Sequence, residues 1–286
     1  MRPLFSTLLI FAILSASCGG ASPSRLSRIR QRGVLVCGVS PGIAGFDEVD
    51  GQGTYKGFDI DQCRAVAAAI LGSAAHIRYQ PIESIDVFER SADIDIVSRR
   101  LTWTLQREGL HVLFGPITFY DGQGFLVPAR VHADRAADLA GVPICVQAGS
   151  EHDVTLTGYF RQHQIPLSKV GVADGAAGGS ALKDGRCEAF SADVSELASV
   201  RSRLDDRPSF RILDDQISRE PLAQLVREED VDLFNVLRWT VFAMIEAEAL
   251  GVTSANLAEM ASRDDPDIAR LLGVDRKSTR LNSSHV

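Results

Sequence analysis

The chain has 286 residues, which is enough for two domains of ordinary size. Hydrophobic residues make up 45% of it and charged residues 23%, which is the composition of a soluble globular protein. Its formal net charge of −7 makes nucleic acid a poor candidate partner, because affinity for nucleic acid rests on neutralising phosphates with basic side chains.

The N-terminus has the pattern of a secretory signal. One Arg precedes the apolar run 4–14, and the small residues 15–17 come directly before Cys18. The apolar run is too short to span a membrane, so we expect residues 1–17 to be a signal peptide that directs the protein to the periplasm.

Two interpretations of the signal junction stay open. Ordinary signal peptidase would release a free protein, whereas Cys18 followed by two glycines fits a bacterial lipoprotein with a tether over residues 18–30. We favour a lipid anchor through Cys18, although Leu14 lies one place farther from it than the preferred lipobox has its leucine.

The remaining cysteines are even in number, as in exported proteins with disulfides. They are Cys37, Cys63, Cys145 and Cys187. Four cysteines allow three pairings, and four buried free thiols are the alternative. The chain has no CxxC motif and its six histidines are scattered, so we expect neither a metal nor a cofactor.

Short apolar runs alternate with helix-like stretches as far as residue 213, which is typical of α/β layers with largely parallel strands. The expected strands are 34–39, 76–82, 94–98, 125–128, 143–147, 169–173 and 188–192. The expected helices between them are 59–71, 151–163, 175–184 and 193–204. After Pro221 the pattern is helical, with expected helices over 230–250, 254–261 and 266–272.

Two segments are candidates for crossovers between domains, the Gly-rich segment 119–125 and the segment 217–226 with its Glu-Pro pair. Two crossovers predict a discontinuous first lobe, residues 31–122 plus 226–274, around an inserted second lobe, residues 123–219. A single large sheet with two ordinary loops is the alternative. Residues 275–286 change composition abruptly and look like a non-native vector sequence, so we exclude them from the fold.

A collinear set of motifs runs from residue 27 to residue 273. It comprises RGVLVCGV (32–39), GFDID (57–61), TWTL (102–105), YDGQGF (120–125), CVQAG (145–149), GRC (185–187), SREPL (218–222) and DPDI (265–268). These motifs resemble the general L-amino-acid-binding proteins of ABC importers, in family three of the extracellular solute-binding proteins. The resemblance implies a periplasmic-binding-protein type II-like fold, with two α/β lobes joined by two crossover segments. Because such lobes move, we favour the disulfides Cys37–Cys63 and Cys145–Cys187, each within one lobe.

The resemblance also implies a site for a zwitterion. Arg107 falls at the position of the family's carboxylate-binding arginine, and Thr102 at that of a hydroxyl contact. Ser150 would add a hydroxyl at a helix N-terminus from the other lobe, and Asp193 matches the carboxylate that binds the amine. The structural alternatives are a solvated helix charge for Arg107 and simple helix N-caps for Ser150 and Asp193.

Three further residues are expected at the cleft. Ser40 lies where relatives place Asp or Asn, and Ile43 where narrower binders have an aromatic that stacks on the ligand. Arg100 and Leu101 replace two small polar residues of the usual Arg-Asn-Thr sequence. We therefore expect an inward-pointing Arg100 to favour acidic ligands such as glutamate or aspartate.

The expected function is capture of an L-amino acid by a monomeric, non-enzymatic binding protein, followed by delivery to an inner-membrane ABC permease. Two alternatives come from other classes. One is a periplasmic enzyme on the same scaffold, such as a cyclohexadienyl dehydratase, which would need a positioned acid or base. The other is a ligand-sensing receptor domain, which is normally fused to a spanning helix and a signalling module.

Overall fold

The computed structural model describes residues 22–40 and 42–274. The expected signal peptide, the lipidation residue Cys18 and the tail 275–286 lie outside the described residues. Within the part of the chain that is described, no helix combines the length and apolar character needed to cross a bilayer.

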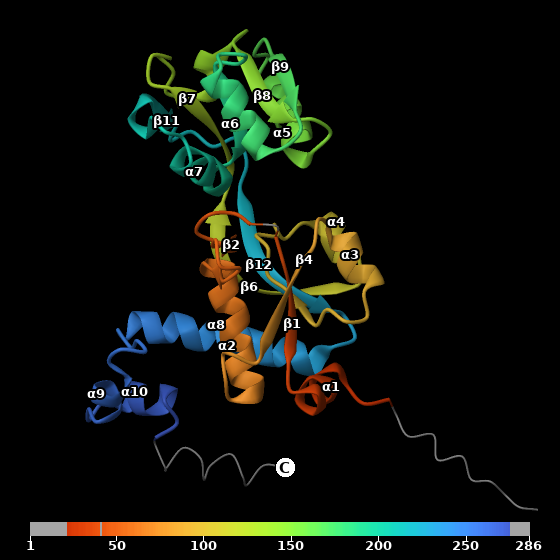
Figure 1. Cartoon of the computed structure of the whole chain (residues 1–286), viewed down its shortest axis with the longest axis vertical. Helices are drawn as coiled ribbons and strands as arrows, with labels where there is room; N and C mark the ends of the chain where they lie inside the picture. The colour runs from red at the N-terminus through yellow and green to blue at the C-terminus, as the bar shows by residue number, and fades with distance from the viewer. Residues whose placement is uncertain (1–21, 41, 275–286) are drawn as a thin grey trace, which may run out of the picture.

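Two five-stranded sheets form the centres of two lobes (Figure 1). The first sheet has the order β4 (Ile77–Pro81), β1 (Leu35–Val39), β5 (Ile96–Val97), β12 (Glu220–Arg227), β6 (Val112–Asp121). The second has the order β11 (Phe210–Ile212), β7 (Gln123–Pro128), β10 (Ala189–Asp193), β8 (Pro143–Gln147), β9 (Ser168–Val172). In each sheet the first βα units pair in parallel, and the strands near the junction of the lobes pair antiparallel. The fold is therefore the two-lobed α/β architecture that the sequence predicted.

Helices and a small hairpin complete each lobe. With the first sheet lie α1 (Arg25–Arg32), the hairpin β2 (Glu48–Val49) and β3 (Tyr55–Lys56), α2 (Phe58–Leu71), α3 (Ile85–Arg90), α4 (Leu105–Glu108), α8 (Val231–Ala249), α9 (Leu257–Ala261) and α10 (Pro266–Leu271). With the second sheet lie α5 (Glu151–Gln162), α6 (Gly175–Lys183), α7 (Val194–Ser202) and the 3-10 turns η1 (Ala136–Leu139) and η2 (Arg207–Ser209).

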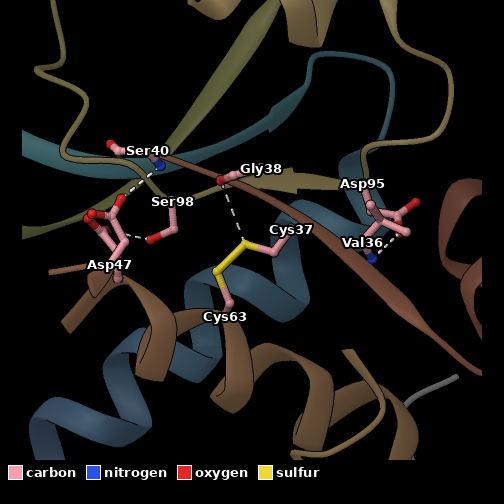
Figure 2. The surroundings of a disulfide bond; sticks show 9 residues. Val36, Cys37, Gly38, Ser40, Asp47, Cys63, Asp95 and Ser98 are labelled. Carbon is pink, nitrogen blue, oxygen red and sulfur yellow. Dashed lines mark hydrogen bonds between the residues drawn. A yellow bond between two sulfur atoms is a disulfide. The ribbon is translucent and has the colours of Figure 1, made fainter. Parts of the chain in front are cut away.

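The core of the first lobe forms where α2 packs on β1. Helix α2 begins after Gly57, whose φ of 123° and close approach to the Phe46 carbonyl exclude a Cβ atom. Its face that includes Ile60 and Val66 is buried against β1, together with Leu233 of α8. The disulfide Cys37–Cys63 joins β1 to α2 within this core (Figure 2).

The second lobe has a separate core on each face of its sheet. Leu156 and Phe160 of α5 cover one face, and Leu182 of α6 with Leu197 of α7 cover the other. The second disulfide, Cys145–Cys187, lies in the latter core. Both disulfides have the pairing that the sequence analysis favoured.

The N-terminal segment differs from expectation. Residues 25–30, expected as part of a tether, belong to helix α1, whose N-terminus is capped by the Ser24 hydroxyl accepting from the Ser27 amide. Leu26 and Ile29 are buried in the first-lobe core, and Arg25 donates to Asp230 at 3.2 Å. The helix forms because it has an apolar face to bury and a buried acidic partner for its arginine.

The expected crossovers also differ in detail. Segment 119–125 contains the end of β6 and the start of β7, and segment 217–226 contains most of β12. Strands β6 and β12 pair antiparallel, from Glu220 opposite Asp121 to Arg227 opposite Val112. The register shifts twice along this ladder, between Leu222 and Leu225. Figure 1 shows β6 and β12 side by side where they lead from the first lobe towards the second. The lobes are thus joined at the two expected segments, where the connecting strands pair to form a two-stranded ribbon.

Candidate functional site

Side chains from both lobes meet at the ends of the strands that point from one lobe to the other. Ser40 follows β1, residues 98–102 follow β5, and Asp193 is the last residue of β10. Ser150, in the loop after β8, is the N-cap of α5. In open α/β sheets, ligands bind in the crevice outside the carboxyl ends of the strands, so these positions define the candidate site.

Arg107 forms an ion pair across the cleft. The Thr104 hydroxyl caps the short helix α4 by accepting from the Arg107 amide at 3.2 Å, which fixes the start of the arginine side chain. One guanidinium nitrogen, Nη1, donates to the Thr102 carbonyl at 2.8 Å. The other, Nη2, lies 2.7 Å from Oε2 of Glu151, the first residue of α5 in the second lobe. The Arg107 side chain is 19% exposed and that of Glu151 69%, so the pair lies at the rim of the cleft.

Asp193 has cationic partners on both sides. Its Oδ1 lies 3.0 Å from Nε2 of His152, which belongs to the same lobe. Its Oδ2 lies 3.9 Å from Nη1 of Arg100, which comes from the first lobe and also donates to the Ser195 hydroxyl at 3.2 Å. Arg100 therefore points inward, across the cleft, and contacts the second lobe.

The pKa values of Asp193 and His152 shift in opposite directions. Burial opposes ionisation of both groups. Their mutual hydrogen bond and charge attraction outweigh burial, and Arg100 and Arg107 add to the effect on Asp193. As a result, the pKa of Asp193 lies below its ordinary value and that of His152 lies above it, which favours an imidazolium–carboxylate pair.

A second acidic group lies beside Thr102. The Thr102 hydroxyl donates to Oε2 of Glu220 at 2.8 Å, and the Ser218 hydroxyl donates to Oε1 at 2.7 Å. Burial and the nearby charge of Asp193 raise the pKa of Glu220, although the two hydroxyl donors act in the opposite direction. Glu220 is the first residue of β12, so this group lies at the junction of the two lobes.

Three other expected residues, Ser150, Ser40 and Ile43, form hydrogen bonds with residues close to them in the sequence. The Ser150 hydroxyl donates to the Gln147 carbonyl at 2.7 Å and accepts from the Asp153 amide, as an N-cap of α5 does. The Ser40 and Ile43 amides both donate to Asp47, at 2.7 and 2.8 Å, and Figure 2 shows the first of these bonds. Asp47 thereby fixes the loop after β1 along the wall of the cleft.

A hollow of about 600 Å³ lies between the lobes next to this cluster. Phe46 of the first lobe, Phe119 and Asp121 at the end of β6, and Ser195 of α7 contribute to its lining. Arg100 links the hollow to the charged groups, because its guanidinium bonds to Ser195 and lies 5.7 Å from the centre of the Phe46 ring.

The lobes also touch directly through hydrogen bonds between backbone groups of the first lobe and side chains of the second. The Ala44 amide donates to the Ser199 hydroxyl at 3.0 Å, and Arg203 donates to the Gly42 carbonyl at 3.3 Å. The arrangement is therefore that of two lobes closed on each other, with α7 against the loop that follows β1.

Three residues of the cluster were missing from the sequence-based site. Glu151 and His152 follow the expected Ser150, where acidic and polar residues are ordinary first-turn features of a helix. Glu220 lies in the SREPL motif, which was noted only as part of the resemblance. Among residues 22–40 and 42–274, no group of three or more His, Cys, Asp or Glu side chains is arranged to hold a metal ion.

Two α/β lobes joined by a β-ribbon, with charged groups from both lobes facing each other, define a two-lobed binding protein. The sequence profile of the bacterial extracellular solute-binding proteins, family 3, matches residues 35–256, and the chain belongs to this family.

Relatives and a solved structure agree with this assignment. The chain is 37% identical to the general L-amino acid-binding periplasmic protein AapJ of Rhizobium johnstonii, over 94% of this chain and 80% of AapJ. It is 38% identical to the glutamate/glutamine/aspartate/asparagine-binding protein BztA of Rhodobacter capsulatus, over 92% of this chain and 79% of BztA. A periplasmic binding protein from Brucella ovis with glutathione bound is similar in structure, with a TM-score of 0.82 and 36% identity, over 89% of this chain and 81% of that one.

Proposed function

We propose that this protein captures an L-amino acid between its two lobes and delivers it to an ABC permease in the inner membrane. The observation that carries the proposal is the placement of Arg107 on one lobe and Asp193 on the other, around one charged cluster. A guanidinium and a carboxylate on opposite walls match the two opposite charges of an amino acid. The names of the relatives AapJ and BztA support the same class of ligand.

In this proposal each lobe contributes one half of the site. Arg107 and the Thr102 hydroxyl bind the α-carboxylate, while Asp193 accepts from the α-ammonium and Ser150 adds donors at the N-terminus of α5. Ser40 and Ile43 line the first-lobe wall. Because the two halves meet only when the lobes close, the ligand stabilises the closed state by contacts that the open state lacks.

Arg100 is the proposed determinant of the ligand side chain. Its guanidinium lies 3.9 Å from Asp193 and donates to Ser195, which lines the 600 Å³ hollow, so an acidic side chain in the hollow would pair with it. The proposal therefore includes a preference for glutamate or aspartate over amino acids with neutral side chains.

The cellular setting completes the proposal. The proposed first lobe includes residues 31–122 plus 226–274 and extends to α1 and to the whole of β12, while residues 123–219 make up the proposed second lobe. The protein is exported to the periplasm as a monomer, where Cys18 anchors it to a membrane through a lipid.

Mass spectrometry of ligand carried through purification, followed by calorimetric titration with a panel of twenty L-amino acids, tests the function. We expect stoichiometric binding of at least one amino acid, with acidic ligands bound more tightly than neutral ones. Absence of binding to all of them, with turnover of prephenate or arogenate instead, would replace the proposal by the enzymatic alternative. Equal or tighter binding of neutral amino acids would contradict the role of Arg100.

A further inference from the structure

The Arg107 guanidinium, which is proposed to bind the ligand carboxylate, already forms an ion pair with a carboxylate of the protein, that of Glu151. Glu151 presents a carboxylate to Nη2 of Arg107 at 2.7 Å, while Nη1 is bound to the Thr102 carbonyl. The two residues lie 44 positions apart, one on each lobe, so their contact depends on how the lobes meet. This distance is that of a charge-assisted hydrogen bond between a carboxylate and a guanidinium.

The backbone holds Glu151 in this position. It is the first residue of α5, directly after the N-cap Ser150, where the helix dipole favours a negative charge. Its partner is equally restricted, because Thr104 caps α4 and the Thr102 carbonyl binds the guanidinium from the other side. The carboxylate therefore approaches a guanidinium that is already oriented.

A ligand carboxylate and the Glu151 carboxylate are competitors for the same donor. Two carboxylates at one guanidinium nitrogen repel each other, so only one of them pairs well with Nη2. We infer that Glu151 is an internal competitor: it holds the lobes together on Arg107 in the ligand-free protein, and an incoming α-carboxylate must displace it. This inference rests on the proposed role of Arg107 in binding the ligand.

The consequence is a lower apparent affinity in the natural sequence. Molecules in which Arg107 is already paired with Glu151 cannot accept a ligand. The apparent dissociation constant is therefore the intrinsic one divided by the fraction of molecules in which Arg107 is unpaired. Since Glu151 is largely exposed, the pair is of the weak surface type, and its removal should tighten ligand binding by about two- to fivefold.

The experiment compares the wild type with Glu151→Gln and with the matched control Glu188→Gln. Glu188 also pairs with an arginine, Arg130, but both residues belong to the second lobe, so its loss leaves the contact between lobes unchanged. Small-angle X-ray scattering of the ligand-free proteins reports lobe opening, and calorimetric titration with L-glutamate reports affinity. We expect Glu151→Gln alone to show a larger radius of gyration and an affinity for L-glutamate about two- to fivefold tighter.

Two results separate this inference from the proposed function. An unchanged radius of gyration, or an unchanged or weaker affinity in Glu151→Gln, would overturn the internal competitor while amino-acid binding stands. Opening of Glu151→Gln in a protein that binds none of the amino acids would support the contact between lobes and refute the proposed function instead.

Discussion

The Ser98 hydroxyl donates to Oδ1 of Asp59 at 2.7 Å, inside the first lobe and behind the cleft. Asp59 lies in the first turn of α2 and is only 6% exposed, and its Oδ2 has no hydrogen-bond partner among the described residues. Burial raises the pKa of this carboxyl to about 7, although the bond from Ser98 acts in the opposite direction. In the folded protein the Asp59 carboxyl is therefore largely protonated below neutral pH.

This pKa predicts that stability falls as the pH rises from about 4 to about 7. In that window the unfolded chain releases the Asp59 proton while the folded protein keeps it, and the folded state is progressively disfavoured. Asp59→Asn should remove this component and raise the free energy of unfolding at pH 8 by roughly 1–4 kcal/mol. Urea denaturation from pH 4.5 to 8 measures it, with the exposed neighbour Asp61→Asn as control. If the unfolding free energy of Asp59→Asn varied with pH as that of the wild type does, Asp59 would not have a raised pKa in the folded protein.

Arg107→Ala should remove most of the binding of the amino acid. The substitution deletes the donors proposed for the α-carboxylate, and the loss of a charged hydrogen-bond set corresponds to more than about 2 kcal/mol of binding free energy. Calorimetric titration measures the affinity, and Arg130→Ala, which removes an exposed arginine of the second lobe, is the control. Near-native affinity in Arg107→Ala would contradict the assignment of the carboxylate site.

Arg100 is expected to determine the choice between acidic and amide side chains. It has a φ of 54°, in the left-handed region that is unfavourable for most residues but readily adopted by Asn. Arg100→Asn should therefore keep or raise stability while lowering the affinity ratio of glutamate to glutamine by about tenfold, the effect of about 1.4 kcal/mol from one charged pair. Competition titrations with the two ligands give the ratio. A ratio equal to that of the wild type would exclude Arg100 as the determinant.

His152 should stabilise the second lobe most strongly at low pH. Burial opposes its protonation, but the hydrogen bond and charge of Asp193 raise the pKa of the imidazole above its ordinary value. The stabilisation is therefore complete below pH about 6.5 and is lost as the pH rises through the pKa of the folded state. His152→Gln should cost about 1–2 kcal/mol at pH 5.5 and less at pH 9.

Chemical denaturation of the ligand-free protein at these pH values measures the effect of His152→Gln. His132→Gln is the control, because His132 is an exposed histidine of the same lobe. A destabilisation by His152→Gln that is the same at both pH values would mean that the imidazole acts as a neutral packing group.

The α/β class, and most strands and helices of the second lobe, can be predicted from the amino-acid sequence. Buried strands such as β1 and amphipathic helices such as α5 are specified by residue patterns within a short segment. Both elements are present in the tertiary structure where the pattern predicts them. The ligand roles of Arg107 and Asp193 come from the family resemblance and stay predictions. The favoured disulfide pairing depended on the two mobile lobes that the resemblance implies, and the structure has this pairing.

The pairing of the two connecting strands and the contacts between charged groups are visible only in the tertiary structure. The strands β6 and β12 were missed because a Gly-Pro pair in one and the Glu-Pro pair in the other obscure the periodicity, while their stability comes from pairing with each other over about a hundred intervening residues. The partners of Arg107 and Arg100 depend in the same way on the packing of one lobe against the other. Local sequence encodes the conformation of each segment, but an ion pair across a cleft depends on the closure of the whole fold.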